Sequence, residues 1–187
     1  MNDPAADWEF LLRDPEPDPP PRPPRRARLL AAARTVRAAR LLRRRGWPDA
    51  QRYLRTLRPA CPPRWEPAEA VRLARREVLP CLTWLRLADP DALCLPRSYA
   101  LVTYLTTLGL PAEVVVARQR SSIGGRFAFH AWAELYDEVL GDIPGLRTGF
   151  AVLQRVGSEQ VGRAGEESGA GSEAGSPRAM GSPGSAV

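Results

Sequence analysis

Hydrophobic residues recur at two different spacings along this chain of 187 residues, and the spacing changes near residue 111. Before that point apolar residues recur every three or four positions, the spacing of a helix with one buried face. The pattern is clearest after Pro67, at Val71, Ala74, Val78, Leu82 and Leu85. Together with the Ala, Leu and Arg content, it predicts helices over residues 27–45, 49–57 and 95–108, and from residue 67 onward.

Prolines and glycines mark where these helices begin and end. Pro67 and Pro96 lie in first helical turns, where a backbone N–H is not needed. Pro80 is expected to kink or end its helix midway, because proline cannot donate the helical hydrogen bond. Gly109, with Pro111 just beyond it, closes the helix over residues 95–108.

After Pro111 the pattern becomes that of extended strands. Residues 113–118 (EVVVAR) are strongly β-prone, and residues 119–126 form a polar loop that contains glycine. Residues 127–135 alternate between two faces, with His130, Trp132 and Glu134 on the same face. Short strands are expected over residues 139–142 and 150–156. Helices followed by strands predict an α+β fold, in which N-terminal helices pack on a small antiparallel sheet.

The two ends of the chain differ from this central part. Residues 13–24 contain seven prolines, and we interpret residues 1–25 as a proline-rich flexible segment. Residues 157–187 contain eight glycines, six serines and no aromatic residue, so a disordered tail is expected there. The folded unit is therefore predicted over residues 26–156.

Composition excludes several kinds of mechanism. All 27 basic residues are arginine, so a lysine Schiff base and a P-loop lysine are excluded. One histidine is too few for multi-histidine zinc or iron sites, and three cysteines without a secretory signal do not form a disulfide framework. No apolar run of about 18 residues is present. We therefore expect a soluble cytoplasmic protein with reduced thiols, no metal or organic cofactor and no membrane partner.

The formal net charge of +6 is concentrated near the N-terminus, where residues 22–45 carry ten arginines and no acidic residue. Such a segment could bind phosphates or an acidic peptide. No aromatic stacking platform or groove-reading motif accompanies it, so nucleic acid is not expected as a partner. A composition rich in arginine and alanine is also typical of a GC-rich genome, which lowers the weight of the charge.

Cys94 and His130 are the residues that could carry covalent chemistry. Cys94 directly precedes a predicted helix, where free backbone N–H groups and the helix dipole favour a thiolate. A free cysteine is otherwise most often a small buried hydrophobic residue. His130 lies within a predicted strand and, taken alone, is more typical of a half-buried histidine with a satisfied hydrogen bond.

Asp142 is the candidate third member, because positions 130 and 142 are symmetric about Tyr136. An odd-length loop centred on Tyr136 would place both residues opposite each other on one face of a hairpin. A two-residue loop would place them on opposite faces. No Asn-Gly or Asp-Gly pair demands the two-residue loop, so the odd loop, or a bulge, is allowed. A cysteine before a helix, a histidine on a strand and an aspartate on the next strand suit acyl transfer by a cysteine nucleophile.

Four segments, CLPRSYALVTYLTTLGLPAEVVVARQR, FAFHAWAEL, VLGD and FAVLQRV, resemble a known family. They are similar to the transglutaminase-like peptidase, protein B, of lasso peptide biosynthesis, over about residues 67–156. The resemblance is strongest at CLPRS, which begins at Cys94, and at HAWAE, which begins at His130. It implies that the family's catalytic cysteine, histidine and aspartate fall on Cys94, His130 and Asp142.

The resemblance further implies a transglutaminase-like, papain-like cysteine protease fold and hydrolysis at the junction of leader and core in a precursor peptide. The implied partners are that leader peptide, a separate leader-recognition protein and an asparagine-synthetase-like cyclase. Residues 1–60 contain no alternating β-prone run for a fused recognition module, so the split form is expected. Two alternatives stay open: a non-catalytic peptide-binding adaptor on the same fold, and a transglutaminase-type acyl transferase.

Other residues near these motifs receive more modest interpretations. Cys81 is a rival nucleophile because Leu82 repeats the Cys-Leu pair, but Cys94 is preferred because an uninterrupted helix follows it. The third cysteine, Cys61, is interpreted as incidental. Trp132 is expected to pack beside His130 as a shield, Glu134 to lie at the rim of the site, and Asp137 to belong to the hairpin turn.

Overall fold

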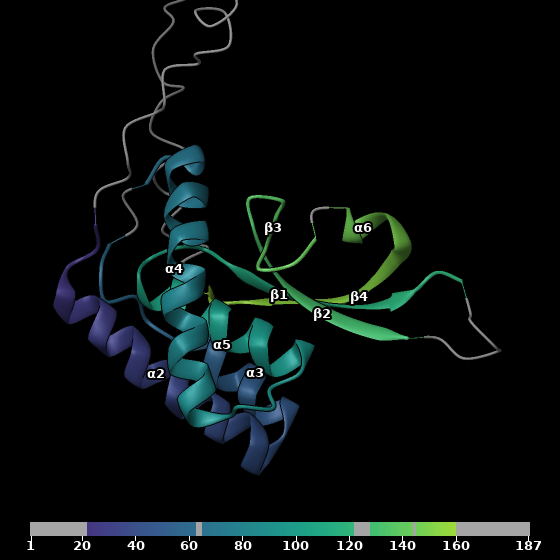
Figure 1. Ribbon diagram of the computed structural model, residues 1–187, viewed down its shortest axis with the longest axis horizontal. Coiled ribbons are helices and arrows are strands. Elements are labelled where there is room, and N and C mark those ends of the chain that lie inside the picture. Colours follow the sequence, from purple (N-terminus) through teal and green to yellow (C-terminus); the bar gives the residue numbers. More distant parts are fainter. Residues whose placement is uncertain (1–21, 63–64, 122–127, 144, 160–187) are drawn as a thin grey trace, which may run out of the picture.

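The computed structural model describes residues 22–62, 65–121, 128–143 and 145–159 (Figure 1). The first elements are the helices α2 (Arg25–Arg45), α3 (Trp47–Arg55), α4 (Pro67–Ala88) and α5 (Cys94–Thr107). The strands β1 (Glu113–Gln119), β2 (Phe129–Leu135), β3 (Glu138–Leu140) and β4 (Phe150–Gly157) follow, with the short helix α6 (Leu146–Gly149) ahead of β4. The segment predicted over residues 1–25 and the tail predicted over 157–187 lie almost wholly outside the described residues.

The central element of the fold is α5, in which every residue from Ser98 to Thr107 is buried. It contacts α2 and α4 on the helical side and β1 and β2 on the other (Figure 1). Two tyrosines tie it to the outer helices: the Tyr99 hydroxyl donates to the Ala50 carbonyl of α3, and the Tyr104 hydroxyl to Glu77 of α4, each at 2.9 Å. Because α5 is held from all sides, its first residue, Cys94, has a well-defined place.

The four strands form an antiparallel sheet in the order β3-β2-β1-β4. Ala117 of β1 pairs with His130 of β2, and Val115 pairs with Trp132, so these side chains share one face. The opposite face joins the main core through Val114, Ala133, Leu135, Leu140 and Val156. The sequence therefore predicted both the α+β fold and the face that carries His130 and Trp132.

One helix differs from its prediction, because α4 continues through Pro80 as far as Ala88. Proline at this position removes one backbone hydrogen bond. Buried residues on both sides of it hold the helix against the core: Leu73, Ala74, Glu77, Cys81 and Leu85. Of the two expected outcomes, a kink or an end at Pro80, the helix end does not occur, because this packing outweighs the lost bond. Within the described part of the chain, no helix has the length and apolar character that a membrane span requires.

Candidate active site

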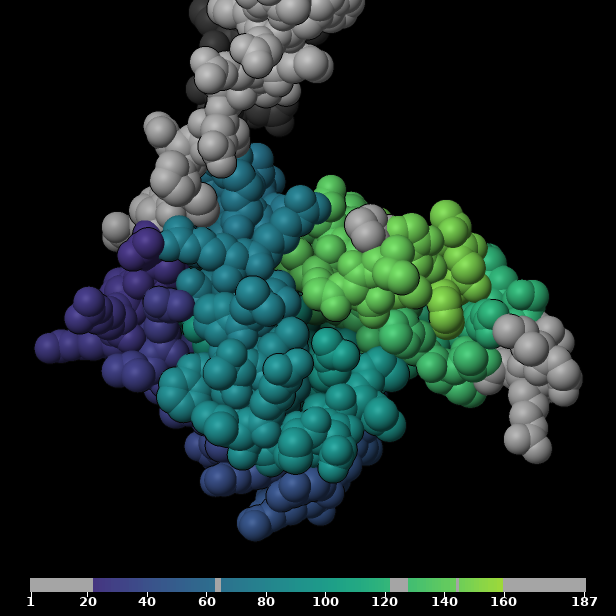
Figure 2. Space-filling view, in the orientation of Figure 1, coloured from purple at the N-terminus to yellow at the C-terminus, as the bar shows by residue number. Residues whose placement is uncertain are grey.

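A cavity of about 330 Å³ lies where the start of α5 meets β2 and the segment after β3. Cys94, His130 and Asp142 all line it, although they are far apart in the sequence. The wall also contains apolar residues: Val78, Leu82, Leu93, Leu101 and Leu140. Figure 2 shows the helices and the sheet segments as two adjoining masses with a hollow between them. The structure thus brings the three predicted residues to one cavity, and their catalytic roles stay a prediction.

Cys94 is the first residue of α5 and is partly exposed to solvent. The first helical hydrogen bond at this end runs from the Arg97 N–H to the Leu93 carbonyl at 3.0 Å. The Cys94 N–H precedes that bond, so it lies among the free donors that stabilise negative charge at a helix N-terminus. The Cys94 N–H therefore stays our candidate donor to an oxyanion.

The other two cysteines lie in different surroundings. Cys81 is fully buried within α4, and burial raises the pKa of its thiol to about 12. A buried, protonated thiol is a poor nucleophile. Cys61 lies in the loop before α4, next to a different hollow lined by Pro24, Trp65 and Leu108. Among the cysteines, Cys94 is the one that lines the cavity with His130.

Ser98 connects the start of α5 to the strand that carries His130. Its hydroxyl oxygen lies 2.7 Å from the Cys94 carbonyl oxygen and 2.8 Å from the Ala131 carbonyl oxygen. Pairing between β2 and β3 ends at Ala133 and Leu140, so Ala131 lies beyond the β3 ladder. The Ser98 hydroxyl thus makes a buried contact with β2 beyond the end of the β3 ladder and links the helix to the strand.

His130 and Asp142 form a close pair. The Nε2 atom of His130 lies 2.7 Å from Oδ2 of Asp142, and the other carboxylate oxygen accepts the Ile143 N–H at 2.8 Å. Partial burial raises the pKa of Asp142, but the hydrogen bonds from His130 and Ile143, with the positive charges of His130 and Arg97, outweigh it and lower the pKa overall. With Nε2 engaged by Asp142, Nδ1 is the nitrogen left to exchange a proton with a thiol.

The hairpin that leads to Asp142 is not the one expected from the sequence. Leu135 pairs with Glu138, which leaves a two-residue loop of Tyr136 and Asp137. Both loop residues have positive φ values, 48° and 64°, as a type I′ turn requires. The odd loop was therefore wrong. A distant contact stabilises the even turn, because the Arg147 guanidinium donates to the carbonyl oxygen and to Oδ1 of Asp137, at 2.9 and 2.8 Å.

Asp142 reaches His130 because β3 ends early. Continued in this register, the strand would place Asp142 opposite Ala131, on the other face from His130. The ladder instead stops at Leu140, and Gly141 adopts a φ of 71°, a left-handed conformation that other residues rarely take. This turn redirects the chain so that the Asp142 carboxylate meets the imidazole. Gly141 was not among the predicted site residues, although a glycine directly before the candidate acid is a signal in the sequence.

Aromatic rings pack around the imidazole. The Trp132 ring lies 6.1 Å from the His130 ring, centroid to centroid, with 28° between their planes, and the Phe150 centroid lies 5.7 Å away. Trp132 itself is buried, which agrees with its predicted role as a packing shield. Glu134 was expected at the rim, but its carboxylate is buried and accepts a hydrogen bond from the Trp132 indole at 2.7 Å. Two arginines from outside β2, Arg147 and Arg155, pair with the buried carboxylate, and the residues next to Glu134 in the sequence do not indicate them.

The described residues contain no group of three or more His, Cys, Asp or Glu side chains that could hold a metal ion. What the cavity does combine is a cysteine at a helix start, an imidazole held by a carboxylate, and free backbone N–H groups. This arrangement can form and hydrolyse a thioester.

Comparison with known proteins gives a family match. The model of the family described as the transglutaminase-like superfamily matches residues 32–155, more than half of the chain. That range includes all of the residues that line the cavity. No curated protein and no solved structure matches the chain significantly.

Proposed function

We propose that this chain, which belongs to the transglutaminase-like superfamily, is a cysteine peptidase that removes the leader from a ribosomally made precursor peptide during lasso peptide maturation. The superfamily includes cysteine peptidases and acyltransferases. The observation that carries the proposal is the cavity in which Cys94 at the start of α5 meets the hydrogen-bonded pair of His130 and Asp142.

In this mechanism the Cys94 sulfur attacks the carbonyl carbon at the junction of leader and core. His130 takes the thiol proton at Nδ1 and then gives it to the leaving amine, which frees the core. The leader stays bound as a thioester on Cys94. Water, deprotonated by His130, then attacks the thioester carbonyl, and the products are the leader carboxylic acid and the free thiol. Asp142 orients the ring through Nε2 in both steps.

The surroundings of the cavity favour a peptide substrate. Two exposed aliphatic side chains belong to this region: Leu93, which lines the cavity, at 76% relative exposure, and Ile143, which follows the lining residue Asp142 in the chain, at 70%. An extended peptide could cover both side chains while its scissile carbonyl lies at the start of α5. A non-catalytic adaptor would need the apolar border but not the His130–Asp142 contact.

The partners of this reaction are also part of the proposal. We expect a cytoplasmic enzyme that needs no cofactor and works beside an asparagine-synthetase-like cyclase, with a separate leader-recognition protein. Helix α2 offers a docking surface for that protein or for an acidic leader: Arg37, Arg40, Arg44 and Arg45 line a groove together with Ala33, Val36 and Leu41. Such a surface would act mainly through charge, so its binding should weaken as salt rises.

The test is cleavage of a candidate precursor, encoded beside this gene, with and without the recognition protein and in water enriched in oxygen-18. We expect the partner to raise cleavage at low precursor concentration by raising the local concentration of leader. Hydrolysis should place one heavy oxygen in the leader carboxylate, whereas transfer to an added amine would give an amide instead. Tight leader binding and full turnover by the isolated chain would refute the split form, and no cleavage with both proteins present would refute the leader peptidase.

A further inference from the structure

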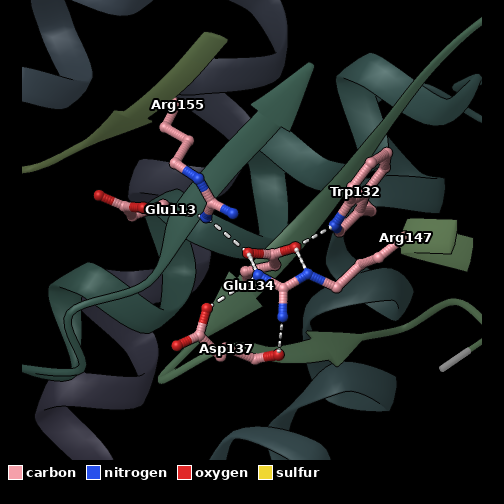
Figure 3. A network of polar contacts seen from close by, with 6 residues as sticks. All are labelled: Glu113, Trp132, Glu134, Asp137, Arg147 and Arg155. Atoms are coloured by element: carbon pink, nitrogen blue, oxygen red, sulfur yellow. Dashed lines mark hydrogen bonds and ion pairs between the residues drawn. The ribbon is translucent and has the colours of Figure 1, made fainter. Parts of the chain in front are cut away.

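The buried carboxylate of Glu134 lies at the centre of a polar network beside the candidate active site (Figure 3). Its Oε1 atom accepts the Trp132 indole N–H at 2.7 Å and lies 3.0 Å from the Arg147 Nε. Its Oε2 atom accepts Arg155 at 2.5 Å and the second Arg147 nitrogen at 3.3 Å. Arg147 therefore grips the carboxylate with two nitrogens, and both oxygens are fully used.

The elements that this network joins also meet in a small hydrophobic cluster, in which Leu146 and Phe150 pack against the group that contains Trp132. Glu134 lies on β2, Arg155 on β4 and Arg147 on the short helix α6. The same Arg147 also binds Asp137 in the turn between β2 and β3. The segment over residues 141–149 is thus fixed near both ends, by Asp142 on His130 and by Arg147 on Glu134.

A role in stability alone explains this arrangement poorly. Burying a carboxylate is expensive, and apolar residues of similar volume often stabilise a fold as well as a buried ion pair does. What the charged network adds is fixed geometry, because directional bonds set the positions of their partners. Those partners are the Trp132 indole, which stacks on His130, and the short helix α6, which follows Asp142 in the chain.

We propose that Glu134 is a positioning residue for the proposed cysteine hydrolase. Through Trp132 and Arg147 it keeps the His130 ring and the Asp142 carboxylate in contact with each other. The hydrogen bond to the Trp132 indole holds the ring that packs against the imidazole. The ion pair with Arg147 holds the segment that follows Asp142 in the chain. This inference rests on the proposed function, because the pair it positions is the one that would activate Cys94.

The test measures alkylation of Cys94 by iodoacetamide relative to Cys61 in the same chain, by peptide mass mapping. This ratio needs no substrate, and the Cys61 rate corrects for reagent and pH. The charged groups lining the cavity that bear on Cys94 are His130, Asp142 and Arg97. In the wild type the ratio should be high at neutral pH. Near pH 9, about where an unassisted thiol ionises by itself, the advantage should shrink.

Glu134→Gln should lower the ratio at neutral pH by about tenfold, the scale of one lost hydrogen bond, and change it little near pH 9. The arginines are partly exposed and can be solvated, so this variant should fold. Trp132→Phe, which removes the indole donor together with part of the buried ring that packs on His130, should lower the ratio as well. In the double variant, Trp132→Phe should lower the ratio by a smaller factor than it does alone, because both changes affect the same Trp132–Glu134 hydrogen bond.

Glu77→Gln is the matched control. Glu77 is equally buried and binds Tyr104 and Arg28, but none of these three residues lines the cavity. Its substitution should lower the melting temperature and leave the ratio unchanged. A Glu134→Gln protein that melts earlier but keeps the wild-type ratio would overturn the positioning role alone. A wild-type ratio near one at neutral pH would overturn both this role and the proposed function.

Discussion

Gly141→Ala tests how the fold brings Asp142 to His130. An added Cβ would meet Leu101 at 3.5 Å and Val78 at 3.6 Å, which are ordinary contact distances, so no steric clash is expected. The penalty comes from the backbone, since a φ of 71° costs a residue with a side chain about 1–2 kcal/mol. That strain is present only while Asp142 faces His130, and a relaxed strand would turn the carboxylate away. Because about 1.4 kcal/mol corresponds to tenfold, we expect precursor cleavage to fall by about tenfold.

The assay compares cleavage rate and thermal unfolding for three variants in the same segment. Gly145→Ala is the matched control: its φ of −76° suits any residue, and nothing lies within 4 Å of the added Cβ. It should behave like the wild type. Gly141→Asn should recover much of the lost activity, because asparagine tolerates the left-handed conformation better than alanine. Equal activity and stability of Gly141→Ala and Gly145→Ala would refute the idea that this glycine places Asp142.

Further predictions concern the residues of the cavity. Cys94→Ala should abolish precursor cleavage, whereas Cys81→Ala and Cys61→Ser should keep most of it; mass spectrometry decides, and full cleavage by Cys94→Ala would exclude this nucleophile. Asp142→Asn should fold and lower turnover by up to about 10⁴-fold. Since the pKa of Asp142 is lowered by folding, its carboxylate stabilises the fold above the ordinary pKa of about 4 and loses this effect as pH falls through the lowered value. The difference in free energy of unfolding between the wild type and Asp142→Asn should therefore shrink on acidification. A difference that grows would contradict the lowered pKa of Asp142. Ser98→Ala should lower the free energy of unfolding in urea by about 1–3 kcal/mol, because it leaves a β2 carbonyl without its partner; an unchanged midpoint would show that this contact is weak.

The sequence predicted those parts of the fold that depend on local patterns. Helical spacing located α4, the Gly109 and Pro111 pair located the end of α5, and alternation assigned the face of β2. These signals are local because a helix or strand with one buried face shows apolar residues at its own side-chain period, which can be read from a few neighbouring positions. The same reasoning placed Cys94 at a helix start, which is where α5 begins.

What the sequence could not predict depends on contacts between distant residues. The turn at Tyr136 carries no glycine, and its two-residue form is held by Arg147 from α6. Glu134 is buried because Arg147 and Arg155 meet it from other elements. The predicted odd loop and the predicted rim position both failed for this reason. Asp142 still meets His130, by the turn at Gly141 and not by the symmetry of the hairpin.

The most direct test of the central claim is to trap the thioester on Cys94. The chain is mixed with precursor and recognition protein, quenched in acid within the first turnover, and its mass is measured intact and after digestion. Our account predicts an added mass equal to the leader acid minus one water, located on Cys94 and absent from Cys94→Ala. Cleavage without any such adduct, or an adduct located on Cys61 or Cys81, would contradict it.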